Sequence, residues 1–466
     1  MSKKILFTYG HARGPQSWGM FAEIIKRLLV NQDNEVYFLN CNGLFPGLCW
    51  YSTHKHIGYC KKCLLPCKKL AKMAGLKDEN ILNLKKIKIN EKFKFNNIEE
   101  ALNLSYKEFN IGLSPVSTIM TITRDYDFSI KSWKKHIQKL LNEECIILEN
   151  IIDFDKKIGF DEIHRFTGRT PTTYPLVEYA KKNNLPYYVY EVGANLNKLR
   201  IDENTMPHDF DNLKNNIKKL WLAAGDDKEL LAKKWFDDRR KGRFQAIESF
   251  TKDQKKDLLP KGFNSEKENI VFFNSSIDEV YAFDCWQHPF VKNENELLYN
   301  LLEHYKDDTN KHFYIRIHPN LTEAKKKHTT QIKELNKYKK QYKNLTVIEP
   351  DEKVDTYALM DIADKVLTTY STAGFEASYY GKISIFAGKA PYEDLDCCYQ
   401  ANSLEELYNL IDSKDLKPKP RENTYPYAYY NQTYGDDYKY YVANSLNDGK
   451  FLDFSINSKQ KMECFK

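Results

Sequence analysis

Alternating short apolar runs and amphipathic segments constrain the fold of this chain more than any other feature. The first block opens with an apolar run at residues 4–9 (KILFTY), an amphipathic stretch at 20–30 (MFAEIIKRLLV) and a second apolar run at 35–41 (EVYFLNC). Strand, helix and strand at this spacing are typical of a βαβ unit, in which the two strands are parallel. Further runs at 160–166 and 187–193 extend the same pattern.

A second block begins at residue 269 (NIVFFNSS) and repeats the alternation as far as ISIFAG at 383–388. Between the blocks, residues 209–257 are helical in pattern and highly charged. Proline, glycine and asparagine within LLPKGFNSEKEN at 258–269 then mark a break. The chain therefore carries two separate α/β patterns joined by a helical stretch.

We predict an α/β chain with two Rossmann-like parallel-sheet domains that face each other across a cleft. A length of 466 residues suits two hydrophobic cores better than one. The expected parts are an N-terminal domain at 1–208 with a cysteine-rich insertion at 41–67, a helical linker at 209–266, a C-terminal domain at 267–420, and a tyrosine-rich tail at 421–466 that crosses back to the first domain.

Charge and the start of the chain exclude several classes of protein. The net charge of +7 is a small excess of 71 basic over 64 acidic residues, and no nucleic-acid-binding module accompanies it, so nucleic acid is not an expected partner. MSKKILFTYG begins a strand and not a signal segment, and no apolar run is long enough to span a membrane. We expect a cytoplasmic protein. The lysine cluster at 61–72 favours phosphate-bearing substrates or peripheral association with the inner membrane face.

Three polar segments come directly after predicted strands of the second block. Ligands of open parallel sheets lie beyond the carboxyl ends of the strands, so these segments hold the candidate binding residues. Hydroxyls and free amides there can hold a phosphate, a histidine titrates near neutrality, and a glycine lets an anion approach the backbone. The candidates are Asn274, Ser275 and Ser276; Arg316 and His318; and Ser371, Thr372, Gly374 and Glu376.

Each candidate also has a purely structural alternative. Ser275 and Ser276 suit an ordinary helix N-cap, and His318 suits a hydrogen-bonded core histidine. Glu376 lies in the first turn of a predicted helix, where it suits either a capping-box carboxylate or an acceptor of hydrogen bonds from ribose hydroxyls. The order and spacing of the three segments favour a phosphate or nucleotide site over a set of unrelated structural roles.

The run RIHP at 316–319, together with VDTYALMDIADKVLTTYSTAGFEASYYGK at 354–382, resembles the donor-binding domain of capsule and O-antigen glycosyltransferases. A His-Pro element followed by a Ser/Thr element is shared by capsule Kdo transferases and bacterial sialyltransferases. It is also similar to the pattern of CDP-glycerol glycerophosphotransferases. The resemblance covers about residues 230–395 and implies the two-domain GT-B fold with a nucleotide-activated donor.

The resemblance implies specific roles for residues of the second domain. His318 would contact the leaving phosphate, and Ser371 with Thr372 would hold the nucleotide or its phosphate. Glu376 is similar to the acidic residue that holds ribose in many GT-B enzymes. The donor nucleotide stays open among CMP, CDP, UDP and GDP, and no catalytic metal is expected. The implied acceptor is a capsule, O-antigen or related surface glycan, free or lipid-linked.

The first block supplies candidates for the acceptor side. His11 lies in the glycine-containing loop after the first strand, where it is a candidate catalytic residue. Glu191 ends another strand, and a strand-end carboxylate suits the base that an inverting transfer needs to take the acceptor proton. An ion pair between Glu191 and Arg169 is the alternative interpretation.

Cysteines crowd one loop region of the first block. Cys60 and Cys63 form a C-x-x-C pair, which suits chelation of one metal ion through adjacent thiolates. Adding Cys41 and Cys49 completes a four-thiolate structural zinc site, with Cys67 as an alternate ligand. The spacing is not that of a standard zinc finger, so reduced free thiols are the alternative.

The leading hypothesis is transfer of a sugar from a nucleotide donor to a surface glycan. A CDP-polyol phosphotransferase of the teichoic-acid type uses similar phosphate-binding elements, and the mass of the product separates the two. A non-hydrolysing sugar epimerase shares the two-lobed fold but needs further acid and base carboxylates that the sequence does not reveal. A non-catalytic polysaccharide biosynthesis or export accessory protein would tolerate His318→Ala.

Overall fold

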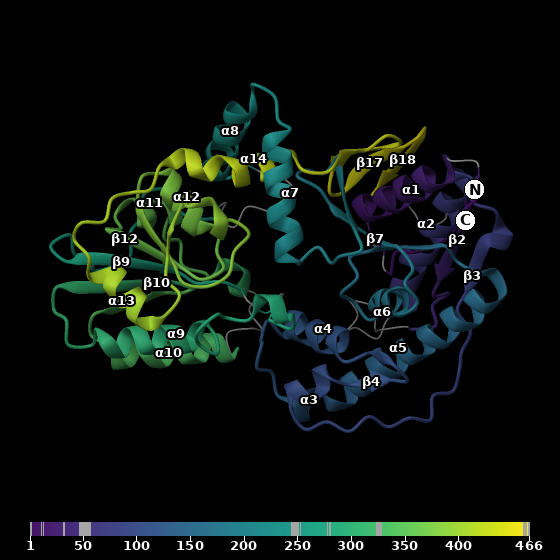
Figure 1. The fold of residues 1–466 in the computed structure, drawn as a ribbon, viewed down its shortest axis with the longest axis horizontal. Coiled ribbons are helices and arrows are strands. Elements are labelled where there is room, and N and C mark those ends of the chain that lie inside the picture. The colour runs from purple at the N-terminus through teal and green to yellow at the C-terminus, as the bar shows by residue number, and fades with distance from the viewer. Residues whose placement is uncertain are drawn as a thin grey trace. The chain divides into compact units, whose positions relative to one another are not determined.

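The computed structural model of the chain describes residues 2–10, 12, 14–30, 33–45, 57–243, 251, 253–276, 278, 281–322, 329–459 and 464. The chain folds into two compact units, each built from segments that are distant in the sequence (Figure 1). Unit 1 comprises Met1–Ile119, Ser129–Pro207 and Tyr434–Lys466, and unit 2 comprises Met120–Phe128 and His208–Thr433.

Unit 1 is built on a seven-stranded sheet with the order β15-β8-β7-β6-β1-β2-β3. The five strands from β7 to β3 are parallel, whereas β8 and β15 run antiparallel to their neighbours. The strands are β1 (Lys4–Thr8), β2 (Glu35–Asn40), β3 (Ile81–Asn83), β6 (Glu162–Phe166), β7 (Tyr187–Val192), β8 (Lys198–Glu203) and β15 (Asp436–Asp437).

Helices and small antiparallel elements complete unit 1. Apolar side chains of α1 and α2 form a core with β1 and β2, which explains the amphipathic pattern of the first block. Helix α4 ends in the segment that belongs to unit 2. The elements are α1 (Pro15–Val30), α2 (Ile57–Ala74), α3 (Ile98–Leu102), β4 (Ser105–Tyr106), β5 (Phe109–Asn110), α4 (Leu113–Thr123), α5 (Ile130–Ile158), α6 (Tyr174–Lys182), β16 (Tyr441–Ser445), β17 (Asp448–Phe451) and β18 (Phe454–Asn457).

A buried glutamate of α1 anchors the C-terminal strands in unit 1. The Glu23 carboxylate accepts backbone N–H bonds from Lys439, Tyr440 and Tyr441 at 2.8, 2.8 and 2.9 Å. The Tyr441 ring packs against α1 where the helix carries Gly19, because a Cβ at Gly19 would come within 2.2 Å of the ring. The β16–β18 sheet therefore lies on α1, as Figure 1 shows.

Unit 2 is built on a fully parallel six-stranded sheet with the order β11-β10-β9-β12-β13-β14. Its elements are α7 (Phe210–Leu222), α8 (Lys228–Arg240), β9 (Glu268–Phe273), α9 (Glu294–His304), β10 (Lys311–Arg316), α10 (Thr330–Gln341), β11 (Leu345–Ile348), α11 (Thr356–Asp361), β12 (Lys365–Thr368), α12 (Ala373–Tyr379), β13 (Ile383–Phe386), β14 (Tyr399–Gln400), α13 (Leu404–Asp412) and α14 (Tyr425–Thr433).

Helices cover both faces of the unit 2 sheet (Figure 1). Alternate side chains of β9 point to opposite faces, so Ile270 and Phe272 pack with α9, α10 and α13, whereas Val271 and Phe273 pack with α11 and α12. Burial on both faces explains the continuous apolar run of β9, since every side chain in it faces a core.

Both sheets have the Rossmann strand order, which confirms the prediction of an α/β chain with two Rossmann-like sheets. Numbered within their own units, the six strands of the unit 2 sheet follow the order 3-2-1-4-5-6, and the first six strands of the unit 1 sheet follow the same order, with β15 added at the edge as a seventh. The order reverses between β9 and β12 in unit 2, and between β1 and β6 in unit 1. Loops leave the sheet in opposite directions at such a point, so ligands of this fold bind at the carboxyl ends of these strands.

No helix among the described residues is both long enough and apolar enough to span a lipid bilayer.

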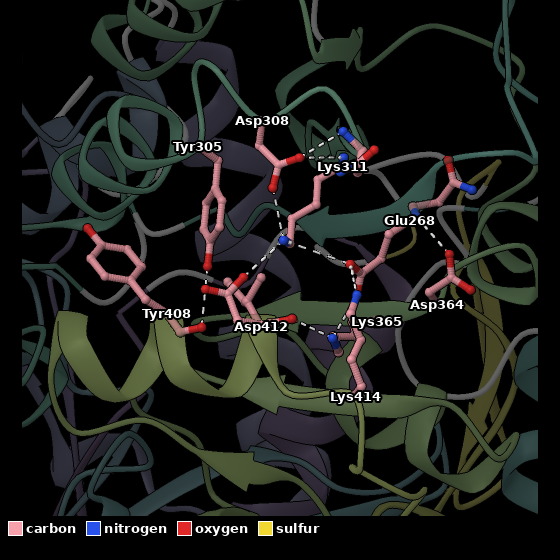
Figure 2. A network of polar contacts seen from close by, with 12 residues as sticks. Glu268, Tyr305, Asp308, Lys311, Asp364, Lys365, Tyr408, Asp412 and Lys414 are labelled. Atoms are coloured by element: carbon pink, nitrogen blue, oxygen red, sulfur yellow. Dashed lines mark hydrogen bonds and ion pairs between the residues drawn. The ribbon is translucent and has the colours of Figure 1, made fainter.

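A network of ion pairs lies at the amino edge of the unit 2 sheet (Figure 2). Glu268, Lys311 and Lys365 are the first residues of the three adjacent strands β9, β10 and β12. The Glu268 carboxylate accepts from Lys365 Nζ at 2.7 Å and from Lys414 Nζ at 2.8 Å. Burial opposes ionisation of Glu268, yet these lysines hold its pKa below the ordinary value. Lys311 pairs with Asp308 and Asp412, both at 2.9 Å.

Substituting the two lysines that hydrogen-bond to Glu268 tests how burial sets the strength of these ion pairs. The side chain of Lys365 is 4% exposed, and that of Lys414 is 72% exposed. Lys365→Met should lower the free energy of unfolding by about 3–5 kcal/mol, because it removes the nearest and most buried of the lysines that pair with Glu268. The control Lys414→Met should change it by less than about 1 kcal/mol. Urea denaturation measures both, and equal losses would contradict the prediction.

Candidate functional site

The three polar segments predicted from the sequence lie at the carboxyl ends of adjacent strands in unit 2. Asn274 to Ser276 follow β9, His318 follows β10, and Ser371 with Thr372 follow β12. Because β9 lies between β10 and β12, the segments meet where the strand order reverses. The candidate site is therefore at the position where this fold binds ligands.

His318 is held on both its backbone and its ring. Its backbone N–H donates to Asn274 Oδ1 at 3.4 Å, which joins the end of β10 to the end of β9. Its Nδ1 accepts the backbone N–H of Asn320 at 3.1 Å. Since Nδ1 acts as an acceptor, the proton of the neutral imidazole belongs on Nε2. The side chain is partly exposed.

Arg316 points to a different loop from His318. Its Nη1 and Nη2 donate to the backbone carbonyls of Glu349 and Glu352 at 2.5 and 3.2 Å, in the turn after β11. The side chain is 3% exposed, and burial lowers its pKa to about 10. Its observed contacts hold that turn against the end of β10.

A segment from the first half of the chain contributes to this edge of unit 2. Arg124 Nη1 contacts Asp278 Oδ2 at 3.0 Å, and Asp278 Oδ1 accepts from Ser276 Oγ at 2.5 Å. Asp125 accepts the N–H of Thr330 at 3.1 Å, at the start of α10. The sequence pattern gave no signal that residues 120–128 pack here.

The segment after β12 is shaped by local hydrogen bonds. Ser371 Oγ accepts the N–H of Ala373 at 3.2 Å, and its carbonyl accepts from Tyr392 at 2.6 Å. Gly374 faces the sheet, where a Cβ would come within 2.6 Å of Thr368 Oγ1 and 2.9 Å of the Tyr392 hydroxyl. Packing of α12 on the sheet therefore requires a glycine here, whether or not an anion approaches it.

Glu376 has three donors in the structure. Its carboxylate accepts from Arg239 Nη2 at 3.1 Å, Thr372 Oγ1 at 3.0 Å and the Tyr357 hydroxyl at 2.6 Å. The charge of Glu376 raises the pKa of Arg239 against the opposing effect of burial. Helix α8 is thereby fixed to α11 and α12 by one carboxylate that is 3% exposed.

Glu294, which the sequence analysis missed, links the chain just after β9 to the chain just after β12. It is fully buried at the first position of α9. Its carboxylate accepts from the side chains of Asn274 and Thr369, from the Ser275 N–H at 3.1 Å and from Gln331 Nε2 at 3.3 Å. Glu294 follows the N-cap Asn293, so in the sequence it looks like an ordinary acidic residue of a first helical turn.

In unit 1, Glu191 lies at the carboxyl end of β7, next to the end of β6. Burial raises its pKa, although a hydrogen bond from Thr167 and the charges of Arg169 and Arg200 oppose the shift. A raised carboxyl pKa suits a base that works near neutrality. The other candidate of this unit, His11, lies outside the described residues.

Three of the predicted metal ligands line one small cavity at the carboxyl ends of β1 and β2. Cys41, Cys63 and Cys67 border a volume of about 30 Å³, and Cys63 Sγ accepts the N–H of Ala12 at 3.3 Å. Burial and the neighbouring Cys63 raise the pKa of the Cys67 thiol. In the part of the chain that the structure describes, which includes Cys60, no three His, Cys, Asp or Glu side chains form a metal site. Cys49 lies outside that part, so zinc binding stays a prediction.

No family model and no curated protein sequence matches the chain. Similar solved structures include the beta Kdo 2,4 transferase of Thermosulfurimonas dismutans KpsC, at 16% identity and a TM-score of 0.38, covering 58% of this chain and 80% of that one. The beta Kdo 2,7 transferase of the same protein has 15% identity and a TM-score of 0.35, with 60% and 80% covered. UDP-GlcNAc 2-epimerase from Neisseria meningitidis has 13% identity and a TM-score of 0.27, with 93% and 97% covered. Likeness at this level carries no argument about activity.

The ion pair of the buried Glu376 with the partly exposed Arg239 should stabilise unit 2 more than the exposed ion pair of Arg240 with Asp361. Glu376→Gln removes the charge that faces Arg239, whose side chain is 32% exposed, and should cost about 2 kcal/mol of unfolding free energy. The control Asp361→Asn removes the partner of Arg240, where both side chains are more than a third exposed, and should cost less than about 1 kcal/mol. Chemical denaturation compares the two, and a larger loss for Asp361→Asn would refute the expectation.

Proposed function

We propose that the chain is a glycosyltransferase of the GT-B kind, which transfers a sugar from a nucleotide-activated donor to a capsule, O-antigen or related surface glycan. One observation carries the proposal. His318 and the polar segments around it lie together where the strand order of a Rossmann sheet reverses, as a nucleotide-phosphate site requires. The resemblance of the His-Pro and Ser/Thr elements to those of capsule transferases supports the same function.

In the proposed reaction, unit 2 binds the donor and unit 1 binds the acceptor. The bond between the anomeric carbon and the leaving phosphate oxygen breaks as the acceptor hydroxyl oxygen bonds to that carbon. His318 donates a hydrogen bond from Nε2 to the leaving phosphate, where negative charge develops. The tautomer implied by the Asn320 contact places a proton on that nitrogen.

Glu191 is the proposed base that takes the proton of the acceptor hydroxyl. A carboxyl group whose pKa is raised by burial holds a proton more readily at neutral pH than an exposed one does. Ser371 and Thr372 are the proposed hydroxyl contacts of the nucleotide or its phosphate. Glu376 is occupied by Arg239 and Tyr357, so we propose that it acts on the donor site by holding Arg239 and α8 in place.

Nucleotide binding by variants of His318 tests this function. In a thermal-shift screen against CMP, CDP, UDP, GDP and ADP, one nucleotide at about a hundred times its dissociation constant should add about 2.7 kcal/mol of stability. His318→Ala should weaken binding of that nucleotide about tenfold or more and lower transfer by about 10²–10⁴-fold. Ser371→Ala should weaken binding to a smaller extent.

The matched control is His304→Ala, at the other end of unit 2 on the last residue of α9, where the exposed ring stacks on Tyr408. This variant should keep wild-type nucleotide binding. If no nucleotide stabilises the wild-type protein, or if His318→Ala binds as tightly as His304→Ala, the proposal fails. The mass of the product then separates sugar transfer from transfer of a phosphoryl-polyol.

A further inference from the structure

The hydrogen bonds around Glu294 have a common direction, because each group that bonds to its carboxylate among the described residues donates. Asn274 Nδ2, the Ser275 N–H and Gln331 Nε2 all donate to Oε1, and the Thr369 hydroxyl donates to Oε2. The donors come from the ends of β9 and β12 and from α10. One buried acceptor therefore joins three separate parts of unit 2.

The same contacts reach the His-Pro turn through Asn274. Its amide nitrogen donates to Glu294, and its amide oxygen accepts the backbone N–H of His318. This fixes the orientation of the amide, since the oxygen and the nitrogen have different partners. Gln331 supports the same loop a second time by donating to the Ser275 carbonyl at 2.9 Å.

Glu294 can act as a hydrogen-bond acceptor in either protonation state. Burial raises the pKa of Glu294 to about 7, although its hydrogen bonds oppose the shift, so near neutrality both protonation states are populated. A protonated carboxyl keeps one oxygen as an acceptor for Asn274, Ser275 and Gln331. Its O–H can then donate to the Thr369 hydroxyl, which rotates to accept. The titratable groups that sense its charge are Tyr126 and Tyr370, whose pKa values are raised mainly by burial.

From this geometry we propose that Glu294 is the positioning residue of the donor site. As a hydrogen-bond acceptor it fixes the ends of β9 and β12, and through Asn274 the His318 turn, in the arrangement that the donor phosphate meets. This inference rests on the proposed function for the identity of the ligand. The positioning of the loops themselves can be measured without any ligand.

Two variants of Glu294 and one control variant separate positioning from stability. Glu294→Gln keeps an acceptor oxygen and should bind the nucleotide identified by the screen within about threefold of wild type. Glu294→Leu fills a similar volume without any acceptor, and should weaken binding about tenfold or more. The control Glu296→Gln changes an exposed residue of the same helix that accepts the Lys292 N–H, and should leave binding unchanged.

Hydrogen exchange of the ligand-free proteins measures directly how firmly the loops are held. Peptides covering 272–276, 316–321 and 368–373 should exchange about tenfold faster in Glu294→Leu than in wild type, and at the wild-type rate in Glu294→Gln and Glu296→Gln. The affinity ratio of wild type to Glu294→Gln should also stay constant between about pH 6 and 8, because both retain the acceptor.

The outcomes distinguish failure of the proposed function from failure of the positioning role of Glu294. If wild type binds no nucleotide, the proposed function fails, and the exchange data alone decide the role of Glu294. Wild-type affinity and exchange in Glu294→Leu would overturn the inference, and so would an affinity ratio that changes more than tenfold with pH. If Glu294→Leu does not fold, Gln331→Met replaces it, since it removes one donor from α10. Unchanged loop exchange in that variant would also overturn the inference.

Discussion

The carboxylate of Glu294 is the interaction on which the carboxyl edge of unit 2 depends. Parallel strands leave this edge without hydrogen-bonded turns between neighbours, so the loops that follow β9, β10 and β12 need other partners. A single buried acceptor supplies them for β9 and β12, and Asn274 extends the connection to β10. The loops that carry the candidate site residues are thus joined through a carboxylate that is fully buried and would not itself touch a substrate.

The amino and carboxyl edges of the unit 2 sheet differ in their polar groups. At the amino edge, Glu268, Lys311 and Lys365 form charge pairs that are satisfied within the protein. At the carboxyl edge, the Glu294 carboxyl has a raised pKa and accepts from uncharged donors, and the ion pair of Arg124 with Asp278 lies at the same edge.

Local patterns predicted the sheets and the polar segments, because a strand buried on both faces has a continuous apolar sequence and the residues after it are polar. They did not predict Glu294, whose position after an N-cap asparagine has an ordinary local explanation. Nor did they reveal that Gly374 is required by close packing against Thr368. Contacts such as Arg124 with Asp278 join residues 154 positions apart, and no local pattern encodes such a pair. These features depend on packing between segments that are distant in the sequence, so local patterns could not predict them.

The chain passes between its two units four times, at 119/120, 128/129, 207/208 and 433/434. Consequently, no single cut in the gene yields either unit as an intact polypeptide. A fragment that begins at residue 208 lacks Arg124 and Asp125, and one that ends at 207 lacks the strands that Glu23 anchors on α1. Either unit can therefore be separated from the other only by cutting the chain at several of these crossings and rejoining the segments.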